Sequence, residues 1–440
     1  MKQNAGQGCA PRQPMQQRIV FIVGMLALFA EAPAWAQGRL PDLVAPDGFG
    51  LHLMRWSSAE DLDNTVAAGF KVVRLGMGWS TVERQKGVYD FVTPGYDGMV
   101  QRCTDRGLRM MLILGSRNRL YGSMRTEEAR RGLAAYAKAA AQRYRGKNIL
   151  WDIWNEPNFE SFWEVTGKPR YGIRPTPASK QDAADFCKLV EVVSPAIKSA
   201  DPTGIVLAPG TSEIRLERGY EAELFRNGLL QWIDAFSTHP YQKQPPEAAV
   251  ADYNALRLLM RKYGREVPIV QGEWGYSLVN WDGTTLSEET KAQYLVRMML
   301  TSLYAGIPVS LWHTLYDMNT ANRRENNFGI MSADHQPKLA YAAAKTLNTS
   351  LAGYRFAARL DFGLFTDYDY ALRFTKGADV TIAFWTMEEK HMATLPVGPG
   401  EGVLVELAGN RKAIAWQTDG LKVELSQSPQ YLVMIGKQPL

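Results

Sequence analysis

The chain has 440 residues, of which 46% are hydrophobic and 22% are charged, so it is long enough for one large domain and a smaller one. Its formal net charge is +5, and it contains no long run of Lys or Arg. This balance excludes the strongly basic signature of a nucleic-acid-binding protein. The 12 Trp and 19 Tyr suggest aromatic surfaces on which a sugar-like ligand could stack.

The first 36 residues have the pattern of a secretory signal. Basic residues precede an apolar run from 19 to 30, and Ala34 and Ala36 form an Ala-x-Ala cleavage site. The run is shorter than the roughly 20 residues of a membrane span, although an uncleaved inner-membrane anchor is the alternative. We therefore expect export to the periplasm or the medium. Cleavage would remove three basic residues and one acidic residue, which lowers the formal charge from +5 to +3.

Short apolar strands alternate with amphipathic helices between residues 49 and 349. The expected strands are 49–54, 71–76, 109–114, 148–156, 205–208, 233–241, 268–275 and 308–313. The expected helices are 59–69, one that ends at 107, 126–144, 179–199, 221–227, 248–263, one that starts at 287, and 338–347. Eight such units predict a closed parallel (β/α)8 TIM barrel. A doubly wound open sheet is the alternative, but its Gly-rich phosphate turn is missing after the early strands.

From residue 354 onward the hydrophobic pattern changes to a period of two, with turns that contain Gly. The expected strands are 354–362, 369–375, 379–386, 391–397, 402–407, 412–417 and 421–435. This pattern predicts a small antiparallel β-sandwich packed on the barrel. We therefore divide the chain into a signal peptide (1–36), a barrel catalytic domain (37–350) and a β-sandwich domain (351–440).

Catalytic residues of such barrels lie at the carboxyl ends of the strands. The strand ends supply Arg74, Asn155, Glu156, His239, Tyr241, Glu273, Trp312 and His313. The two glutamates are the residue pair that acid/base cleavage of a glycosidic bond requires. Barrel strands three places apart stand about 14 Å from each other, which leaves roughly 6 Å between two inward carboxyl groups. That separation is close to the ~5 to 5.5 Å of retaining glycosidases and shorter than most of the ~6.5 to 9.5 Å range of inverting ones.

These residues lie in three short motifs, which follow one another along the chain as Trp154-Asn155-Glu156-Pro157, His239-Pro240-Tyr241 and Gly272-Glu273-Trp274. On these motifs the sequence resembles clan A glycoside hydrolases, the retaining (β/α)8 enzymes, and within the clan family 39 and its neighbour family 5. The segment 426–432 also resembles family 39, especially its bacterial exopolysaccharide hydrolases. Many family 5 relatives have a histidine at the end of the third strand. This chain has Gly115-Ser116-Arg117-Asn118 there, which favours family 39.

The resemblance implies a role for each motif residue. Glu156 would be the general acid/base and Glu273 the nucleophile, a division that needs one protonated and one ionised carboxyl group. Arg74 would lie beside Glu273 and hold it charged, and Tyr241 would donate a hydrogen bond to the same carboxylate.

Asn155 would reach a sugar 2-hydroxyl, and His239 would orient Glu156 or tune its proton affinity. Trp312 would form the floor of the subsite where cleavage occurs. Five aromatic residues in the loops after the strands have two open interpretations, sugar stacking or loop packing. They are Trp79, Trp163, Tyr171, Tyr276 and Trp281.

We expect neither a metal nor another cofactor, because His52, His313 and His335 lack the His-x-His or His-Glu-x-x-His spacing of common metal sites. The expected protein is a monomeric retaining β-glycosidase, endo-acting on a polysaccharide such as an exopolysaccharide of the same cell. An export complex or the inner membrane is a further expected partner. A β-xylosidase or cellulase-like specificity stays open. The rival is a non-catalytic glycan-binding protein of polysaccharide assembly, which would need the aromatic residues but not the acid pair.

Overall fold

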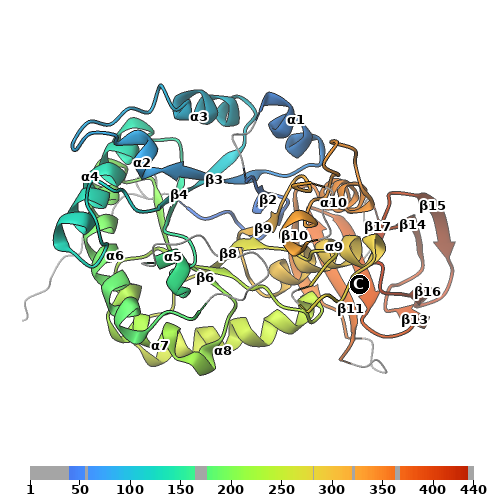
Figure 1. Cartoon of the computed structure of the whole chain (residues 1–440). Helices are drawn as coiled ribbons and strands as arrows, with labels where there is room; N and C mark the ends of the chain where they lie inside the picture. Colours follow the sequence, from blue (N-terminus) through green and yellow to red (C-terminus); the bar gives the residue numbers. More distant parts are fainter. Residues whose placement is uncertain are drawn as a thin grey trace, which may run out of the picture.

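The computed structural model describes residues 39–54, 58–163, 176–280, 282–319, 323–361 and 367–434. Eight parallel strands close into a barrel, and helices form a layer around it (Figure 1). The predicted (β/α)8 fold is therefore confirmed. The barrel strands in spatial order are β2 (Phe49–His52), β3 (Val72–Gly78), β4 (Arg109–Gly115), β5 (Leu150–Ile153), β6 (Ile205–Ser212), β7 (Ala235–His239), β8 (Ile269–Trp274) and β9 (Ser310–His313).

Each barrel strand is followed by at least one helix, and several helices begin at a capping residue that the sequence supplies. The longer helices are α1 (Ala59–Ala67), α3 (Tyr96–Asp105), α4 (Glu127–Arg143), α6 (Lys180–Ala200), α7 (Tyr220–Arg226), α8 (Ala249–Lys262), α9 (Glu288–Tyr304) and α10 (Leu339–Ser350). Short helical segments lie in the loops. They are α2 (Trp79–Val82), α5 (Glu160–Trp163), η1 (Leu216–Arg218), η2 (Leu229–Gln231), η3 (Pro246–Ala248) and η4 (Arg324–Asn326).

The interior of the barrel is filled by apolar side chains, and polar side chains lie toward the carboxyl ends of the strands. Val72 and Leu311 belong to a cluster of buried apolar residues contributed by the barrel strands. Arg74 and His313 follow them by two positions and therefore face the same way, since side chains alternate along a strand. The inward-facing side chains at the carboxyl ends of the strands are thus polar, and they lie beside the loops that follow the strands.

The C-terminal strands form two antiparallel sheets, as predicted (Figure 1). The seven-stranded sheet has the order β1-β10-β11-β12-β17-β14-β15, and β13 pairs with β16. The strands are β1 (Val44–Ala45), β10 (Tyr354–Arg359), β11 (Asp369–Lys376), β12 (Asp379–Thr386), β13 (His391–Leu395), β14 (Gly400–Val405), β15 (Arg411–Trp416), β16 (Leu421–Leu425) and β17 (Gln430–Met434).

Two details of the predicted C-terminal strands need correction. The prediction of one strand over 421–435 is wrong, because β16 and β17 lie in different sheets and are separated by 426–429. Pro429 has no N–H group to offer a ladder, and the Ser426 hydroxyl accepts from the Ser428 N–H instead. In addition, β1 pairs with β10, so residues 44–45, which lie within the predicted barrel domain (37–350), belong to the C-terminal sheet.

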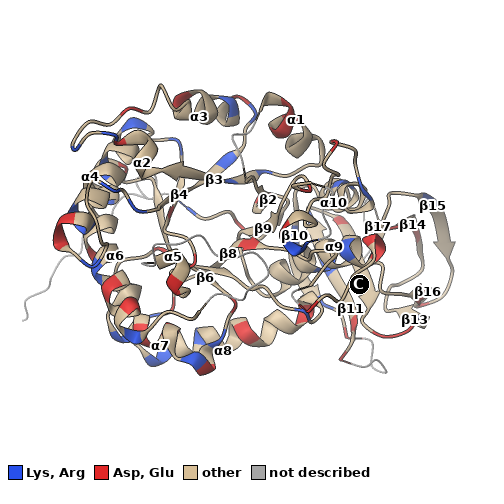
Figure 2. Cartoon of the chain, in the orientation of Figure 1, with Lys and Arg blue, Asp and Glu red and all other residues tan. Residues whose placement is uncertain are grey.

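Charged side chains of both signs are interspersed over the outer helices (Figure 2). This distribution agrees with the small net charge of the chain. Among the described residues, no helix has the length and apolar character that crossing a membrane requires. The predicted signal peptide (1–36) lies outside the described residues.

Candidate active site

The predicted site residues come together at the carboxyl ends of the barrel strands. Arg74 lies in β3, Asn155 and Glu156 follow β5, His239 ends β7 and Glu273 lies in β8. Each of these side chains forms a hydrogen bond or an ion pair with another residue of the group. The barrel therefore assembles them into one buried cluster.

Glu273 accepts hydrogen bonds at both of its carboxylate oxygens. Arg74 donates to Oε2 over 2.9 Å, and the Tyr241 hydroxyl donates to Oε1 over 2.6 Å, so both predicted contacts are present. The Nδ1 atom of His52 lies 2.7 Å from Oε2. Burial alone would raise the pKa of Glu273, but His52, which lies beside the carboxylate and donates a hydrogen bond to it, brings the pKa well below its ordinary value. Glu273 is therefore ionised at neutral pH.

An irregularity in the register of β8 turns Glu273 toward the barrel axis. Gln271 pairs with Ser310 of β9, and Trp274 pairs with Trp312, so β8 has one residue more than its neighbour over this span. Gln271 accordingly points to the helix layer, where it bonds to α8. In a regular strand Glu273 would share that outward face, and the extra residue re-aims it.

Arg74 is fully buried and links three polar residues. Its Nε and one terminal nitrogen donate to Asp152 over 3.0 and 2.8 Å, and the same terminal nitrogen donates to the Asn155 amide oxygen over 2.8 Å. Asn155 thus keeps its NH2 group as a donor for a ligand. Gly272 provides the space, since a Cβ there would lie 2.7 Å from Ser237 Oγ and 3.5 Å from Arg74 Nε. Sequence reasoning missed Asp152, although it lies in the strand that precedes Glu156.

Glu156 sits in a different environment from Glu273. Its backbone has a positive φ of 50°, and its N–H donates to the Gly210 carbonyl over 3.0 Å. One carboxyl oxygen lies 3.0 Å from His239 Nδ1. Burial, reinforced by the charge of Glu273, raises the pKa of Glu156 to about 8. Burial also lowers the pKa of His239 well below its usual range, so a protonated Glu156 faces a neutral imidazole at neutral pH.

The two carboxyl groups face each other across a short gap. One oxygen of Glu156, one oxygen of Glu273 and a nitrogen of His239 all lie within 4.8 Å of one another. The strand geometry predicted roughly 6 Å between the carboxyl groups. The observed approach suits direct attack by one carboxylate and leaves less room than the ~6.5 to 9.5 Å that accommodates an intervening water.

A pair of histidines beside Glu273 was not assigned to the site from the sequence. His52 and His313 are paired in register because β2 and β9 close the barrel. Their Nδ1 atoms are 3.2 Å apart, and His313 Nδ1 is 3.9 Å from Glu273 Oε1. Burial lowers the pKa of His313 to about 4, so its ring is neutral at neutral pH. The signal was available only in part: the first and eighth strands of a closed barrel are neighbours, but the predicted first strand ran to residue 54 and did not mark His52 as its end.

Within the described residues, two overlapping sets of side chains have ligand atoms close enough for a metal ion. One set is His52, Glu273 and His313, and the other is Glu156, His239 and Glu273. Both rely on Glu273, which already accepts from the Arg74 guanidinium, and that positive charge disfavours a cation beside it. We therefore interpret both sets as parts of the acid pair's surroundings.

The sugar-stacking interpretation is wrong for two tryptophans. Trp79 is fully buried and stacks on Tyr121 with ring centroids 4.9 Å apart. Trp163 is also fully buried and packs edge-on against Trp154 at 5.2 Å. Both rings fill the core, so the loop-packing alternative holds for them. Trp281 lies outside the described residues, as does Tyr171.

The prediction that Trp312 forms the floor of the cleavage subsite is also wrong. Trp312 is fully buried, and its indole N–H donates to the Phe328 carbonyl over 3.0 Å. Leu311 belongs to the barrel interior, so Trp312 faces the helix layer and His313 takes the inward position. The strand end was identified correctly, but the inward residue is the next one along the chain.

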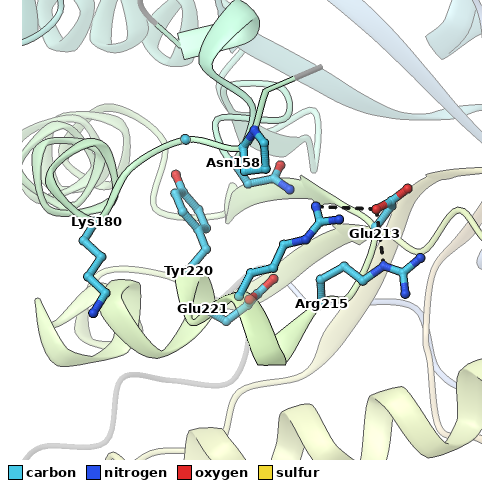
Figure 3. Close-up of a pocket in the computed structure, with 9 residues that line it drawn as sticks. Asn158, Lys180, Glu213, Arg215, Tyr220 and Glu221 are labelled. Carbon is cyan, nitrogen blue, oxygen red and sulfur yellow. Dashed lines mark hydrogen bonds and ion pairs between the residues drawn. The ribbon is translucent and has the colours of Figure 1, made fainter. Parts of the chain in front are cut away.

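Two cavities lie among the loops at the carboxyl ends of the barrel strands, one after β5 and β6 and the other after β2 and β9. One of about 280 Å³ is bordered by Asn158, two residues after Glu156, and by residues that follow β6 (Figure 3). The other, of about 300 Å³, is bordered by residues that follow β2 and β9, among them Leu53 and Thr314. Each cavity is thus bordered by a loop that follows a strand next to one of those that carry the acid pair, β6 beside β5 and β9 beside β8.

Comparison with known proteins identifies one matching family. The family model described as Cellulase (glycosyl hydrolase family 5) matches residues 44–317, which is more than half of the chain. No curated protein sequence matches the chain.

Several solved structures share the fold. A family 39 glycoside hydrolase from the gut symbiont Bacteroides cellulosilyticus WH2 is 21% identical with a TM-score of 0.73, and the match covers 90% of this chain and 81% of that one. A monomeric β-xylosidase from Caulobacter crescentus CB15 is 17% identical with a TM-score of 0.61, covering 92% and 98%. A family 30 endoxylanase from Clostridium papyrosolvens C71 is 11% identical with a TM-score of 0.61, covering 90% and 97%. At these identities the likeness shows the fold alone.

Proposed function

Because the chain belongs to the cellulase family, glycosyl hydrolase family 5, we propose that it cleaves β-glycosidic bonds with retention of anomeric configuration. The matching model is that of family 5, whereas the end of the third strand favoured family 39. Both are clan A families, so the family and the fold confirm the predicted resemblance to the clan and identify the chain as a glycosyl hydrolase. The observation that carries the retaining mechanism is the acid pair itself. Oxygens of Glu156 and Glu273 lie within 4.8 Å, and the two pKa values shift in opposite directions.

In the first step, a carboxylate oxygen of Glu273 attacks the anomeric carbon while Glu156 gives its proton to the leaving oxygen. The result is a covalent glycosyl–enzyme ester and a released alcohol. In the second step Glu156, now ionised, takes a proton from water, the water oxygen attacks the anomeric carbon, and Glu273 leaves as a carboxylate. In the tautomer that carries its proton on Nδ1, His239 donates a hydrogen bond to the carboxylate that Glu156 becomes.

The groups around the pair support the proposed roles. Arg74, Tyr241 and His52 hold Glu273 in place and ionised before attack. The NH2 group of Asn155 is available to a sugar 2-hydroxyl, an interaction that strengthens in the transition state.

For the substrate we propose an endo-cleaved polysaccharide, such as an exopolysaccharide of the same cell. Support comes from the two cavities, since a chain that continues past both sides of the cleaved bond needs binding space on both. A xylan- or xyloside-cleaving enzyme is the second candidate, because a β-xylosidase and an endoxylanase share the fold. A non-catalytic glycan-binding protein would not need a buried acid pair with two different proton affinities.

The proposed site of action is outside the cytoplasm, as the pattern of residues 1–36 suggests. Expression of the full chain in a Gram-negative host followed by mass spectrometry of the periplasmic protein tests this. An N-terminus at Gln37 supports export with cleavage. An intact N-terminus in the membrane fraction favours the anchor.

Two further experiments test the proposed assembly. Size-exclusion chromatography of the same protein tests the proposed monomer, and co-purification from its native host tests the proposed association with an export complex.

The decisive experiment compares wild type with Glu156→Gln and Glu273→Gln on a panel of β-linked polysaccharides, with product anomers followed by NMR. We expect the β-anomer first, and a loss of at least about a thousandfold in both variants on unactivated substrates. With Glu156→Gln, an aryl glycoside with a good leaving group should still form the glycosyl–enzyme, and azide should restore turnover. First release of the α-anomer, or unchanged activity in either variant, would contradict the proposal.

A further inference from the structure

The cavity beyond Glu156 is the starting point. We call it the arginine pocket. It has a volume of about 280 Å³ and lies between the N-terminus of α6, the end of β6, and η1 with α7 (Figure 3). Its lining residues are Asn158, Pro177, Ala178, Lys180, Glu213, Arg215, Arg218, Tyr220 and Glu221.

The arginine pocket is built on the same backbone as the acid/base. The Glu156 N–H donates to Gly210, and Asn158 exchanges two hydrogen bonds of 2.7 and 3.0 Å with the backbone of Ser212. Glu213 follows immediately, and its N–H donates to the carbonyl of His239 over 2.7 Å. Glu156 protonates the leaving oxygen, so sugar residues on the leaving-group side extend past Glu156. The pocket lies on that side.

The charge of the arginine pocket is unbalanced toward positive. Arg215 and Arg218 share one carboxylate, that of Glu213, over 3.3 and 3.7 Å (Figure 3). Two guanidinium groups offer more donors than one carboxylate can accept. Lys180 stands on the opposite rim, and among the described residues it forms no ion pair.

Glu221, the other acidic residue that lines the arginine pocket, does not neutralise its surplus positive charge. Glu221 is buried, and burial raises its pKa to about 7, so it carries only part of a charge at neutral pH. Outside the cavity, Asp252 interacts electrostatically with Arg215, and Glu217 lies near Glu221 and Asp252. Neither carboxylate lines the cavity, so the guanidinium donors that face it stay available to a ligand.

The inner wall of the pocket also contains polar groups without partners. The hydroxyl of Tyr220 and one carboxyl oxygen of Glu221 are buried and form no hydrogen bond with any described residue. Buried polar groups are normally paired, so this wall suits a polar ligand better than an apolar one. A neutral sugar could use the hydroxyl and the carboxyl group, but it would leave the surplus guanidinium donors without an anionic partner.

We propose that the arginine pocket binds the carboxylate of a uronic acid residue on the leaving-group side of the cleaved bond, so that the substrate is an acidic polysaccharide. A carboxylate on a pyranose ring matches the planar fork of Arg215 or Arg218, which binds such a group through two parallel hydrogen bonds. The uronate would then complete the ion pairing that Glu213 provides only in part. This inference rests on the proposed glycosidase function, since that function defines the leaving-group side.

The test separates binding from cleavage by using Glu273→Gln as the background. The probes are oligosaccharides from uronate-containing bacterial polysaccharides, each compared with the same oligosaccharide after its carboxyl groups are reduced to hydroxymethyl groups. Calorimetry gives Kd for the background protein and for the added changes Arg215→Gln, Arg218→Gln and both together. The matched control is Arg226→Gln, an exposed arginine of α7 that pairs with Glu223 outside the pocket.

We expect acidic oligosaccharides to bind about tenfold or more tightly than their reduced forms, with a preference that declines as salt rises. The double arginine variant should abolish this preference, and Arg226→Gln should keep it. Equal binding of acidic and reduced forms, or a preference that survives the double variant, would overturn the inference. Hydrolysis of neutral glycans with no effect of the arginines would overturn it while the glycosidase function stands. Arginine-dependent binding without any cleavage by wild type would leave the pocket and reject the glycosidase.

Discussion

The two acids at the barrel mouth differ in proton affinity because their partners differ. Glu156 is buried and faces the charge of Glu273, and both favour its protonated form, while the imidazole beside it is uncharged. Glu273 accepts from Arg74 and Tyr241, and both favour its ionised form. The pair therefore holds one proton at neutral pH, and the structure assigns that proton to Glu156.

This arrangement predicts the pH dependence of activity. We expect kcat/KM to fall as pH rises through about 8, because Glu156 then loses the proton that the leaving oxygen needs. On the acid side, activity should fall only well below pH 4.5, since the pKa of Glu273 is lowered from that value. The measurement is a pH–rate profile on a polysaccharide. An aryl glycoside with a good leaving group serves as control, and its alkaline limb should be weaker. An alkaline limb near the ordinary carboxyl pKa of about 4.3 would contradict the assignment.

His52 predicts a second effect on that profile. The change His52→Gln removes the imidazole whose Nδ1 lies 2.7 Å from Glu273, so the pKa of Glu273 should rise. We expect the acid limb to move upward, with little change in kcat at neutral pH, where Glu273 stays ionised. His391→Gln in the C-terminal sheet is the matched control and should change neither. A lower kcat with an unmoved acid limb would mean that His52 only supports packing.

At the scale of single residues, the sequence predicted the site best where a residue ends a strand. The positions of Glu156 and Glu273 followed from apolar runs that stop at an acid. Trp312 was predicted to face the barrel interior in place of His313, because a shift of one residue along a strand exchanges its inward and outward side chains. The pairing of His52 with His313 depends on barrel closure between residues 261 positions apart, which no local pattern contains.

At the scale of elements, α6 shows how a local signal fixes one wall of the arginine pocket. Ser179 and Asp182 form a capping box, in which the Ser179 hydroxyl accepts from the Asp182 N–H over 3.1 Å and Asp182 accepts the Ser179 N–H over 2.9 Å. Helix α6 therefore begins at Lys180, which lines the pocket. This start was predicted from the sequence to within one residue.

The capping box contributes to the stability of the folded chain. We expect Ser179→Ala to lower the free energy of unfolding by about 1 kcal/mol, because the Asp182 N–H loses its acceptor. Urea unfolding followed by circular dichroism measures the change. Ser199→Ala near the other end of α6 is the control and should stay within about 0.5 kcal/mol of wild type. Equal effects of the two changes would show that the cap adds nothing to stability.

Other elements could not be predicted because tertiary context decides them. The strand β1 has two residues and exists because β10 offers a sheet edge more than 300 positions later in the chain. The split between β16 and β17 assigns neighbouring segments to different sheets, although both alternate with the same period. Periodicity identifies a strand, but it does not say which sheet the strand joins.

At the scale of the whole molecule, the seven-stranded sheet belongs to two cores at once. Leu372 and Phe374 of β11 join the core shared with the barrel helices, whereas Ala371 joins the core between the two C-terminal sheets. Alternation along one strand thus connects the barrel to the sandwich. The barrel and the seven-stranded sheet share one continuous core, so we expect the chain to unfold as a unit.

A buried ion pair marks the junction between the two parts and allows this to be tested. Glu247 in η3 accepts two hydrogen bonds of 2.7 and 2.8 Å from Arg297 of α9, and a third of 2.7 Å from the indole of Trp385 in β12. All three side chains are almost fully buried. The change Glu247→Gln would leave the Arg297 charge buried without a counter-ion, which costs about 3 to 5 kcal/mol.

We expect the unfolding midpoint of Glu247→Gln to fall accordingly, with tryptophan fluorescence and circular dichroism still reporting one common transition, since the shared apolar core remains. Glu128→Gln, which breaks the exposed pair with Lys86, is the matched control and should cost no more than about 1 kcal/mol. Two separate transitions in the wild type would show that the barrel and the sheet fold independently. Separation in Glu247→Gln alone would mean that this ion pair, more than the apolar core, couples them.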